Sequence, residues 1–223
     1  MNKNIPAIFF VIASLVNWAG KYFEIDAMAA AVKPALMPLL ALSVLVYALS
    51  NRLDKRMLSL LVTAELFGGV GDICLLHSSF PLFAGGIAAF LIGHLFYLAL
   101  LGRAAWKGMG LTGWAGGFVA VGTLVFGLVK ILGITGDLLI PMVIYALVLV
   151  TLVFCTFCGL VQQQNKIGWG LLFTGAVFFA VSDSLLAAGI FGTHFPGQEF
   201  VVMFTYVLAQ TLLAVGSVRL ARL

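Results

Sequence analysis

Long apolar stretches separated by short polar breaks run along the whole chain. A helix needs about 20 apolar residues to cross a bilayer, and eight of the stretches reach or approach that length. The strict alternation of apolar and polar positions that is typical of membrane β-barrels is absent from the sequence. The pattern predicts eight helical spans, at residues 5–20, 28–49, 57–76, 82–102, 113–133, 138–160, 167–190 and 198–220.

Composition supports the same class of protein. Hydrophobic residues make up 63% of the 223 residues and charged residues only 9%, and the mean hydropathy is +1.16. A soluble domain carries about 25% charged residues. We therefore expect an all-α, polytopic membrane protein with eight transmembrane helices in one bundle, forming a single domain over residues 1–223 with short loops that make neighbouring helices antiparallel.

Basic residues are distributed unevenly between the two sides of the predicted bundle. Lys21 and Lys130 lie on one side. The other side carries Lys3, Arg52, Lys55, Arg56, Arg103, Lys107, Lys166, Arg219 and Arg222. Because positive loops stay in the cytoplasm, we expect both termini there, in an integral protein of a bacterial inner membrane. The net charge of +4 thus reflects topology and does not indicate a nucleic-acid partner.

Carboxylates inside the spans are the strongest functional signal. Glu65, Gly69 and Asp72 share one face of the third span, and Asp183 lies inside the seventh. Ionisable groups in a membrane are costly, and they usually face a bundle interior or a wet cavity where they serve a function. The glycine leaves that face flat, so that another helix or a substrate can come close.

Other polar side chains lie at similar depth. With a rise of ~1.5 Å per residue, Lys33, Asp72 and Asp183 fall ~7–8 Å from the midplane on the side away from the termini. The remaining polar residues lie near that level or nearer the middle: Asn17, Glu65, His94, Tyr97, Tyr145, Tyr206 and Gln210. This common level predicts one buried polar chamber that opens toward the outer leaflet.

Several of these residues also have a structural interpretation. Lys33 either pairs with an aspartate in the chamber or extends its amine to the lipid headgroups. His94 either serves the site or bonds a backbone carbonyl. Glu65 could be neutral and bonded across helices, and the tyrosines could be packing rings with a bonded hydroxyl.

Two weaker patterns remain. Val70-Gly71-Asp72 is echoed by Val181-Ser182-Asp183, 111 residues later. The echo is explained either by a four-plus-four repeat of residues 1–110 and 111–223 or by chance in a Leu/Val/Gly-rich chain. Cys155 and Cys158 form a C-x-x-C in mid-span with no His or acid nearby, so we interpret them as apolar filler and expect no metal site and no cofactor.

A set of motifs resembles a known family. The motifs are Lys33-Pro34, Gly71-Asp72, Phe83-x-x-Gly86-x-x-Ala89-Phe90-x-x-Gly93-His94-x-x-Tyr97, Gly175-Ala176-x-x-Phe179-x-x-Ser182-Asp183 and Thr205-Tyr206-x-x-Ala209-Gln210. In this order, from the second span to the eighth, they resemble the YhhN/TMEM86 family of lysoplasmalogenases. The resemblance implies a membrane enzyme that hydrolyses the vinyl-ether bond of lysoplasmalogens to a fatty aldehyde and glycerophosphocholine or glycerophosphoethanolamine.

The resemblance also implies that Lys33, Asp72, His94, Tyr97, Asp183, Tyr206 and Gln210 belong to the family's polar set. Acid cleavage of a vinyl ether requires one carboxylic acid as proton donor and one carboxylate facing the developing cation. We therefore expect Asp72, Asp183 and Lys33 to be catalytic. The expected substrate-binding residues are Glu65, His94, Tyr97, Tyr145, Tyr206, Gln210 and Asn17, and the expected partners are a lysophospholipid and membrane lipids.

Two other classes of protein fit the same buried polar residues. A secondary transporter would also carry buried Lys, Asp and His and an internal repeat. It would need access to both faces, whereas the third of the bundle nearest the termini lacks ionisable residues. A lipid-binding protein without chemistry would tolerate Asp-to-Asn changes.

Overall fold

Eight α-helices form the structure, a computed structural model that describes residues 4–77 and 79–221. All eight are long and apolar enough to cross a membrane, which confirms the predicted all-helical fold class. Lys3 and Arg222, counted in the charge distribution, lie outside the described residues. The helices are α1 (Ile5–Tyr22), α2 (Asp26–Ser50), α3 (Lys55–Cys74), α4 (Phe80–Ala105), α5 (Leu111–Ile131), α6 (Leu139–Gln162, preceded by the 3-10 turn η1, Gly136–Leu138), α7 (Lys166–Ile190) and α8 (Gln198–Leu220).

Polar side chains in the loops cap the beginnings of two helices, α3 and α7. Asp54 caps α3, where its carboxylate accepts a hydrogen bond from the Met57 amide at 2.8 Å. Asn165 caps α7 in the same way, by accepting from the Gly168 amide at 3.0 Å. These caps satisfy amides that the first helical turn leaves without a partner, so they stabilise the starting points that the apolar pattern predicts.

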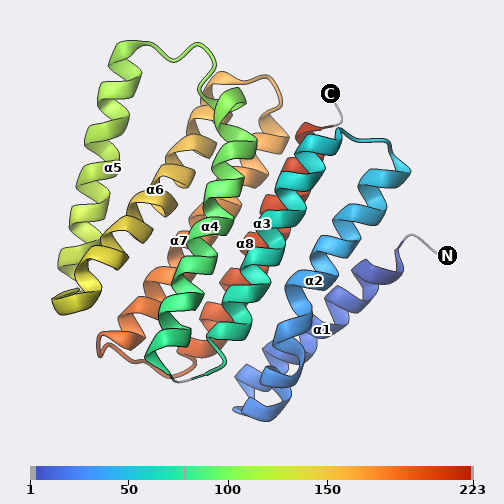
Figure 1. Cartoon of the computed structure of the whole chain (residues 1–223), viewed down its shortest axis with the longest axis vertical. Helices are drawn as coiled ribbons and strands as arrows, with labels where there is room; N and C mark the ends of the chain where they lie inside the picture. The colour runs from blue at the N-terminus through green and yellow to red at the C-terminus, as the bar shows by residue number, and fades with distance from the viewer. Residues whose placement is uncertain (1–3, 78, 222–223) are drawn as a thin grey trace.

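The connections alternate between the two ends of the bundle. Figure 1 shows the α2–α3, α4–α5 and α6–α7 loops at the end nearest the two termini, and the other four connections at the opposite end. The helix pairs with the most extensive contacts are α7 with α8, α3 with α4 and α1 with α2. This arrangement is the antiparallel neighbour packing expected from short loops.

Helix α5 is placed differently from the other helices. It packs on α6 at one edge of the bundle, whereas α4 makes its main contacts with α3 and α6 (Figure 1). The reason lies in the buried face of α5, where Gly117 admits the Phe154 ring of α6 so closely that a Cβ there would lie 2.4 Å from it. Neighbours in sequence are therefore not always the main packing partners.

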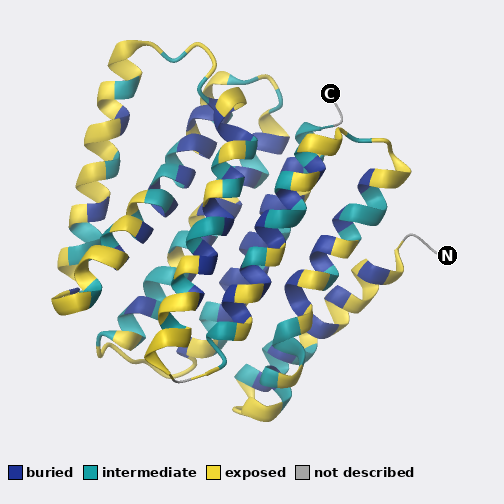
Figure 2. Ribbon diagram, viewed as in Figure 1, coloured by how far each residue is buried: buried dark blue, intermediate teal, exposed yellow. Residues whose placement is uncertain are grey.

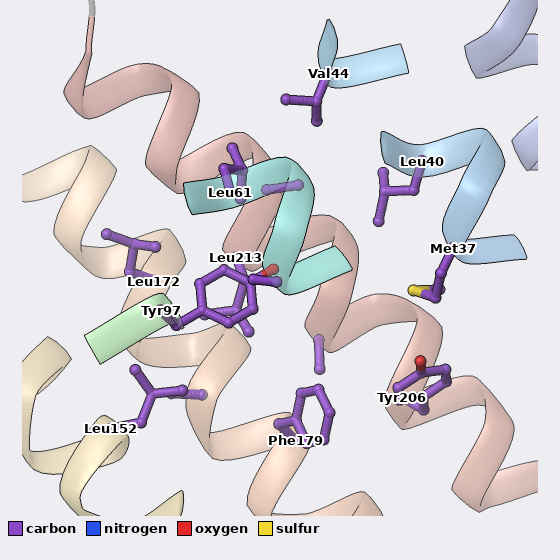
Figure 3. Packing of buried hydrophobic residues seen from close by; sticks show 14 of the residues in the cluster. Met37, Leu40, Val44, Leu61, Tyr97, Leu152, Leu172, Phe179, Tyr206 and Leu213 are labelled. Carbon is purple, nitrogen blue, oxygen red and sulfur yellow. The ribbon is translucent and has the colours of Figure 1, made fainter. Parts of the chain in front are cut away.

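Buried residues concentrate where α2, α3, α4, α7 and α8 meet. Figure 2 shows the dark buried surface on the inward faces of these helices and exposed residues along the outer faces, above all on α5. Many exposed residues are large and apolar, including Phe118, Phe126 and Ile131 of α5, as expected for a surface covered by lipid. In Figure 3, leucine and methionine side chains of the core surround the rings of Tyr97, Phe179 and Tyr206.

Small residues bring the central helices into close contact. At Gly93 of α4, an added Cβ would lie 3.1 Å from the Ala64 carbonyl oxygen of α3. At Gly175 of α7, it would lie 3.0 Å from both the Ala209 carbonyl oxygen and the Leu213 nitrogen of α8. Backbone atoms at that distance leave little room for a methyl group, so glycine sets the separation of these helices.

Candidate functional site

Asp72 lies at the centre of a polar network in the bundle core. Its side chain is almost wholly buried, and the Tyr206 hydroxyl donates a hydrogen bond to Asp72 Oδ2 at 2.8 Å. The Lys33 amine lies 3.7 Å from Asp72 Oδ1 as an ion pair. The structure thus places Lys33 beside an aspartate, as the first of its two interpretations requires.

The network continues along α3, α4 and α8. The Gln210 amide donates to the Tyr206 hydroxyl at 3.5 Å, and the Tyr97 hydroxyl lies 3.2 Å from Gln210 Oε1 and 2.6 Å from Glu65 Oε1. All of these side chains are buried. Six of the residues predicted from sequence are therefore joined in one connected group: Lys33, Glu65, Asp72, Tyr97, Tyr206 and Gln210.

Asp183 forms a second, separate centre on α7. The Tyr145 hydroxyl of α6 donates a hydrogen bond to Asp183 Oδ2. The preceding residue, Ser182, donates to the Val202 carbonyl oxygen of α8 at 3.0 Å, which fixes this turn of α7 against α8. Each aspartate thus has its own tyrosine partner.

An apolar pocket opens beside Asp183. It contains about 360 Å³ of empty space, part of it open to the surroundings, and we call it the Asp183 pocket. Asp183 and Tyr145 are its polar lining residues, and its apolar walls include Leu75, Phe83, Ile87, Phe90, Met142 and Leu186. A hydrocarbon chain fits such walls, and the carboxyl group at one side could reach a polar bond within the chain.

His94 lies in a second cavity, whose lining residues are all buried. This cavity, the His94 chamber, is lined by Ala64, Gly68, Phe90, Gly93, His94, Tyr97, Phe179 and Gln210. The His94 ring packs against Phe179, with the ring centres 4.4 Å apart, and against Tyr145 at 5.6 Å. Neither ring nitrogen has a hydrogen-bond partner among the described residues, so the carbonyl-bonded alternative is not seen.

Asn17 is the predicted site residue that the structure places apart. Its side-chain amide donates to the Ala29 carbonyl oxygen of α2 at 3.0 Å, next to the close contact between Gly20 and Ala29. Asn17 thus joins α1 to α2, and this hydrogen bond does not involve the carboxylates. Within residues 4–77 and 79–221, no three His, Cys, Asp or Glu side chains cluster closely enough to share a metal ion.

Sequence reasoning missed the residues that shape the space around the carboxylates. Phe90 and Phe179 belong to the motifs but were assigned no role. Their ring centres lie 6.2 Å apart, and each ring contacts Tyr206, the hydrogen-bond partner of Asp72. Gly71 admits the Phe90 ring, because a Cβ there would lie 2.6 Å from Phe90 Cε2. The available signal was the spacing of Phe90 one helical turn before His94.

Proteins of one name from three mammals are similar to this chain. Lysoplasmalogenase TMEM86B of Homo sapiens is 29% identical over 170 residues, which cover 72% of this chain and 64% of the human protein. The protein of that name from Sus scrofa is 32% identical over 157 residues, covering 69% and 61%. The one from Mus musculus is 29% identical over 185 residues, covering 82% and 73%. The matched region is thus less than two thirds of the human and pig proteins.

The match to the family itself covers most of the chain. No solved structure matches this sequence. A model of the YhhN family matches residues 28–217, from the helix that carries Lys33 to the helix that carries Tyr206 and Gln210. With eight candidate membrane spans and a buried polar centre inside the matched region, the chain is an integral membrane protein that belongs to the YhhN family.

Proposed function

We propose that this protein hydrolyses the vinyl-ether bond of lysoplasmalogens, with a fatty aldehyde and a glycerophospho-headgroup compound as products. The observation that carries the proposal is the presence of two carboxyl groups inside candidate membrane spans, Asp72 buried and Asp183 half-buried, with Asp183 lining an apolar pocket. The relatives named lysoplasmalogenase support the same reaction class. An amphiphile in the bilayer could reach this pocket sideways, with its bond near Asp183.

The two carboxyl groups differ in their charge environment, which suggests their roles. Lys33 lies beside Asp72, so we assign Asp72 as the ionised carboxylate that faces positive charge developing on the substrate. Asp183 has no cation within ion-pair distance among the described residues, and it lines the pocket directly. We therefore assign Asp183 as the acid.

The reaction follows from these roles. Asp183 donates its proton to the β-carbon of the vinyl ether, and the positive charge that results is shared by the α-carbon and the ether oxygen. Water adds to the α-carbon and returns a proton to Asp183. The hemiacetal then loses its hydroxyl proton, the bond from carbon to the glycerol oxygen breaks, and that oxygen takes up a proton. One water is consumed, and the acid is regenerated.

Tyr145 and Tyr206 orient the carboxyl groups in this scheme. Each hydroxyl donates to one carboxyl oxygen, and this leaves the other oxygen of each aspartate directed to the substrate or to Lys33. Hydrogen bonds of this kind hold a catalytic group in its working geometry without taking part in the bond changes.

Isotope transfer from heavy water tests the proposal. Purified protein in detergent, supplied with a lysoplasmalogen in heavy water, should release aldehyde that carries one deuterium on the carbon next to the carbonyl group. A reference aldehyde added to the same mixture reports exchange by enolisation. Absence of aldehyde release would refute the activity, and aldehyde without deuterium above the reference would refute protonation at carbon.

A further inference from the structure

One aromatic side chain separates the two cavities. Phe90 lines both the Asp183 pocket and the His94 chamber, and no other residue lines both among those described. The Asp183 pocket extends along α4 from Phe83 to Phe90, and the chamber continues along the same helix from Phe90 to Tyr97. The cavities therefore follow one another along α4, with the Phe90 ring between them.

The Phe90 ring packs against two other aromatic rings and against the backbone of a glycine. It packs edge-to-face against Tyr206 and Phe179, with ring centres 5.8 Å and 6.2 Å away. On α3 it lies against Gly71, where no side chain projects toward it. On the fourth side is the empty space of the Asp183 pocket, into which the ring could turn.

The chamber behind the ring contains polar atoms without partners. Both ring nitrogens of His94 are buried and have no hydrogen-bond partner among the described residues. The same is true of Glu65 Oε2, which lies outside the chamber lining on the residue that Tyr97 of the chamber bonds. His94 is 2% exposed and Glu65 is wholly buried. Side chains fill the chamber too closely for a water molecule to enter in this conformation. Buried polar groups of this kind are costly unless water or another partner satisfies them.

We propose that the His94 chamber is the water site of the reaction and that Phe90 is its gate. This inference rests on the proposed hydrolase function. When the Phe90 ring turns into the Asp183 pocket, the chamber gains room for water. A neutral imidazole offers one donor and one acceptor, and the polar groups of Tyr97 and Gln210 also line the chamber, so it holds the polar groups for the two to four contacts that a buried water requires.

The chemistry explains why a separate water site is useful. A lipid chain in the Asp183 pocket displaces water from its apolar walls, yet the cation formed there must meet one water molecule. Water in the chamber is one residue away from each carboxylate centre. Gln210 of its lining bonds Tyr206, the partner of Asp72, and His94 of its lining packs on Tyr145, the partner of Asp183. Because the Phe90 ring can turn into the Asp183 pocket only while no lipid occupies it, the chamber takes up its water before the substrate binds.

The test measures water contact at Tyr97, which lines the chamber and is 1% exposed. Radiolytic hydroxyl-radical labelling in ¹⁸O-water reports water beside a buried tyrosine without requiring turnover. Phe90→Ala and the milder Phe90→Leu should raise Tyr97 labelling several-fold over the parent protein, whereas the bulkier Phe90→Trp should lower it. Phe83→Ala, which removes the same ring from the far end of the Asp183 pocket, should leave Tyr97 labelling unchanged.

Kinetics supply the second readout. With lysoplasmalogen as substrate, Phe90→Trp should lower kcat more than Phe83→Trp does, because both rings line the lipid pocket but only Phe90 also borders the chamber. Equal Tyr97 labelling in the Phe90 variants and the parent protein would refute the gate. A rise in Tyr97 labelling in Phe83→Ala as large as the rise in Phe90→Ala would also refute it. If the parent protein releases no aldehyde, the hydrolase proposal fails, while the labelling series still decides whether Phe90 controls water entry.

Discussion

At the residue scale, the two aspartates are set apart by their neighbours. Asp72 is buried with Lys33 and Tyr206, whereas Asp183 is half-buried, bonded to Tyr145 and open to the pocket. Two carboxyl groups with different surroundings can hold different protonation states, which is the usual requirement for acid catalysis with a counter-charge. The consequences can be tested by substituting single residues.

Replacing either aspartate by asparagine should abolish most of the activity while the protein still folds. Asn has nearly the shape of Asp and costs less to bury than a charge, so Asp72→Asn and Asp183→Asn should insert normally. Loss of a proton-transferring group typically lowers a rate by ~10²–10⁴. Aldehyde release by the purified variants measures the effect. Asp137→Asn, at an exposed loop position, is the matched control, and parent-like rates in either site variant would contradict the assigned roles.

The ion pair of Lys33 with Asp72 should appear as an energetic coupling. Lys33→Met leaves a buried carboxylate without its cation, and breaking a buried pair in this way costs about 3–5 kcal/mol. The double variant with Asp72→Asn removes both charges and should regain part of that loss. A double-mutant cycle on unfolding free energies in detergent should give a coupling of about 0.5–3 kcal/mol. Strictly additive effects would show that the two side chains do not interact.

At the element scale, the position of each carboxylate depends on how closely the helices approach. Glycines at the contacts of α3 with α4 and of α7 with α8 set those separations. The α7–α8 contact is reinforced by hydrogen bonds from Ser182 to Val202 and from Gln198 to the Leu185 carbonyl oxygen at 2.6 Å. The turn that carries Asp183 is thus fixed from the neighbouring helix.

A methyl group at the α7–α8 contact should therefore destabilise the bundle. Gly175→Ala would place a Cβ 3.0 Å from backbone atoms of α8, and overpacking of this kind costs about 1–3 kcal/mol. Gly122→Ala on α5 meets nothing within 4 Å and should stabilise its helix by about 0.5–1 kcal/mol. Thermal unfolding in detergent compares the two. A loss of stability in Gly122→Ala as large as that in Gly175→Ala would contradict the packing argument.

At the scale of the whole molecule, both chain ends lie at the same end of the helical bundle (Figure 1). The α2–α3, α4–α5 and α6–α7 loops lie at that same end (Figure 1). With the adjoining helix turns they carry six of the twelve Lys and Arg residues: Arg52, Lys55, Arg56, Arg103, Lys107 and Lys166. At the opposite end, Lys21 bridges Asp26 of α2, at 2.9 Å, and Glu199 of α8. Acidic residues at this end thus help to join α1 to α2 and α8.

The charge distribution predicts that the termini are cytoplasmic. A cysteine added at the C-terminus should resist a membrane-impermeant thiol reagent in intact cells and react once the cells are opened, because basic loops are retained in the cytoplasm. A cysteine at Asp137, in the α5–α6 loop, is the matched control and should react in intact cells. The reverse pattern would invert the orientation and place the Asp183 pocket at the other leaflet.

The sequence by itself determined the class of fold and the list of polar residues. In a bilayer every backbone amide must be satisfied within its own segment, so length and apolarity alone predict eight helices with ends within a few residues. Ionisable residues inside such segments are costly to bury, so each one can be recognised individually in the sequence as a candidate site residue. Most of the polar residues singled out in this way belong to the buried centre.

Only the tertiary structure decided which of these residues meet. Tyr206 reaches Asp72 across 134 positions of sequence, and Tyr145 reaches Asp183 across 38, so no local spacing encodes either pair. The same packing joined Asn17 to α2 and placed Phe90 between two cavities. Partners of this kind depend on which helix faces lie together and how closely glycines allow them to approach, and that is a property of the assembled bundle and not of any single span.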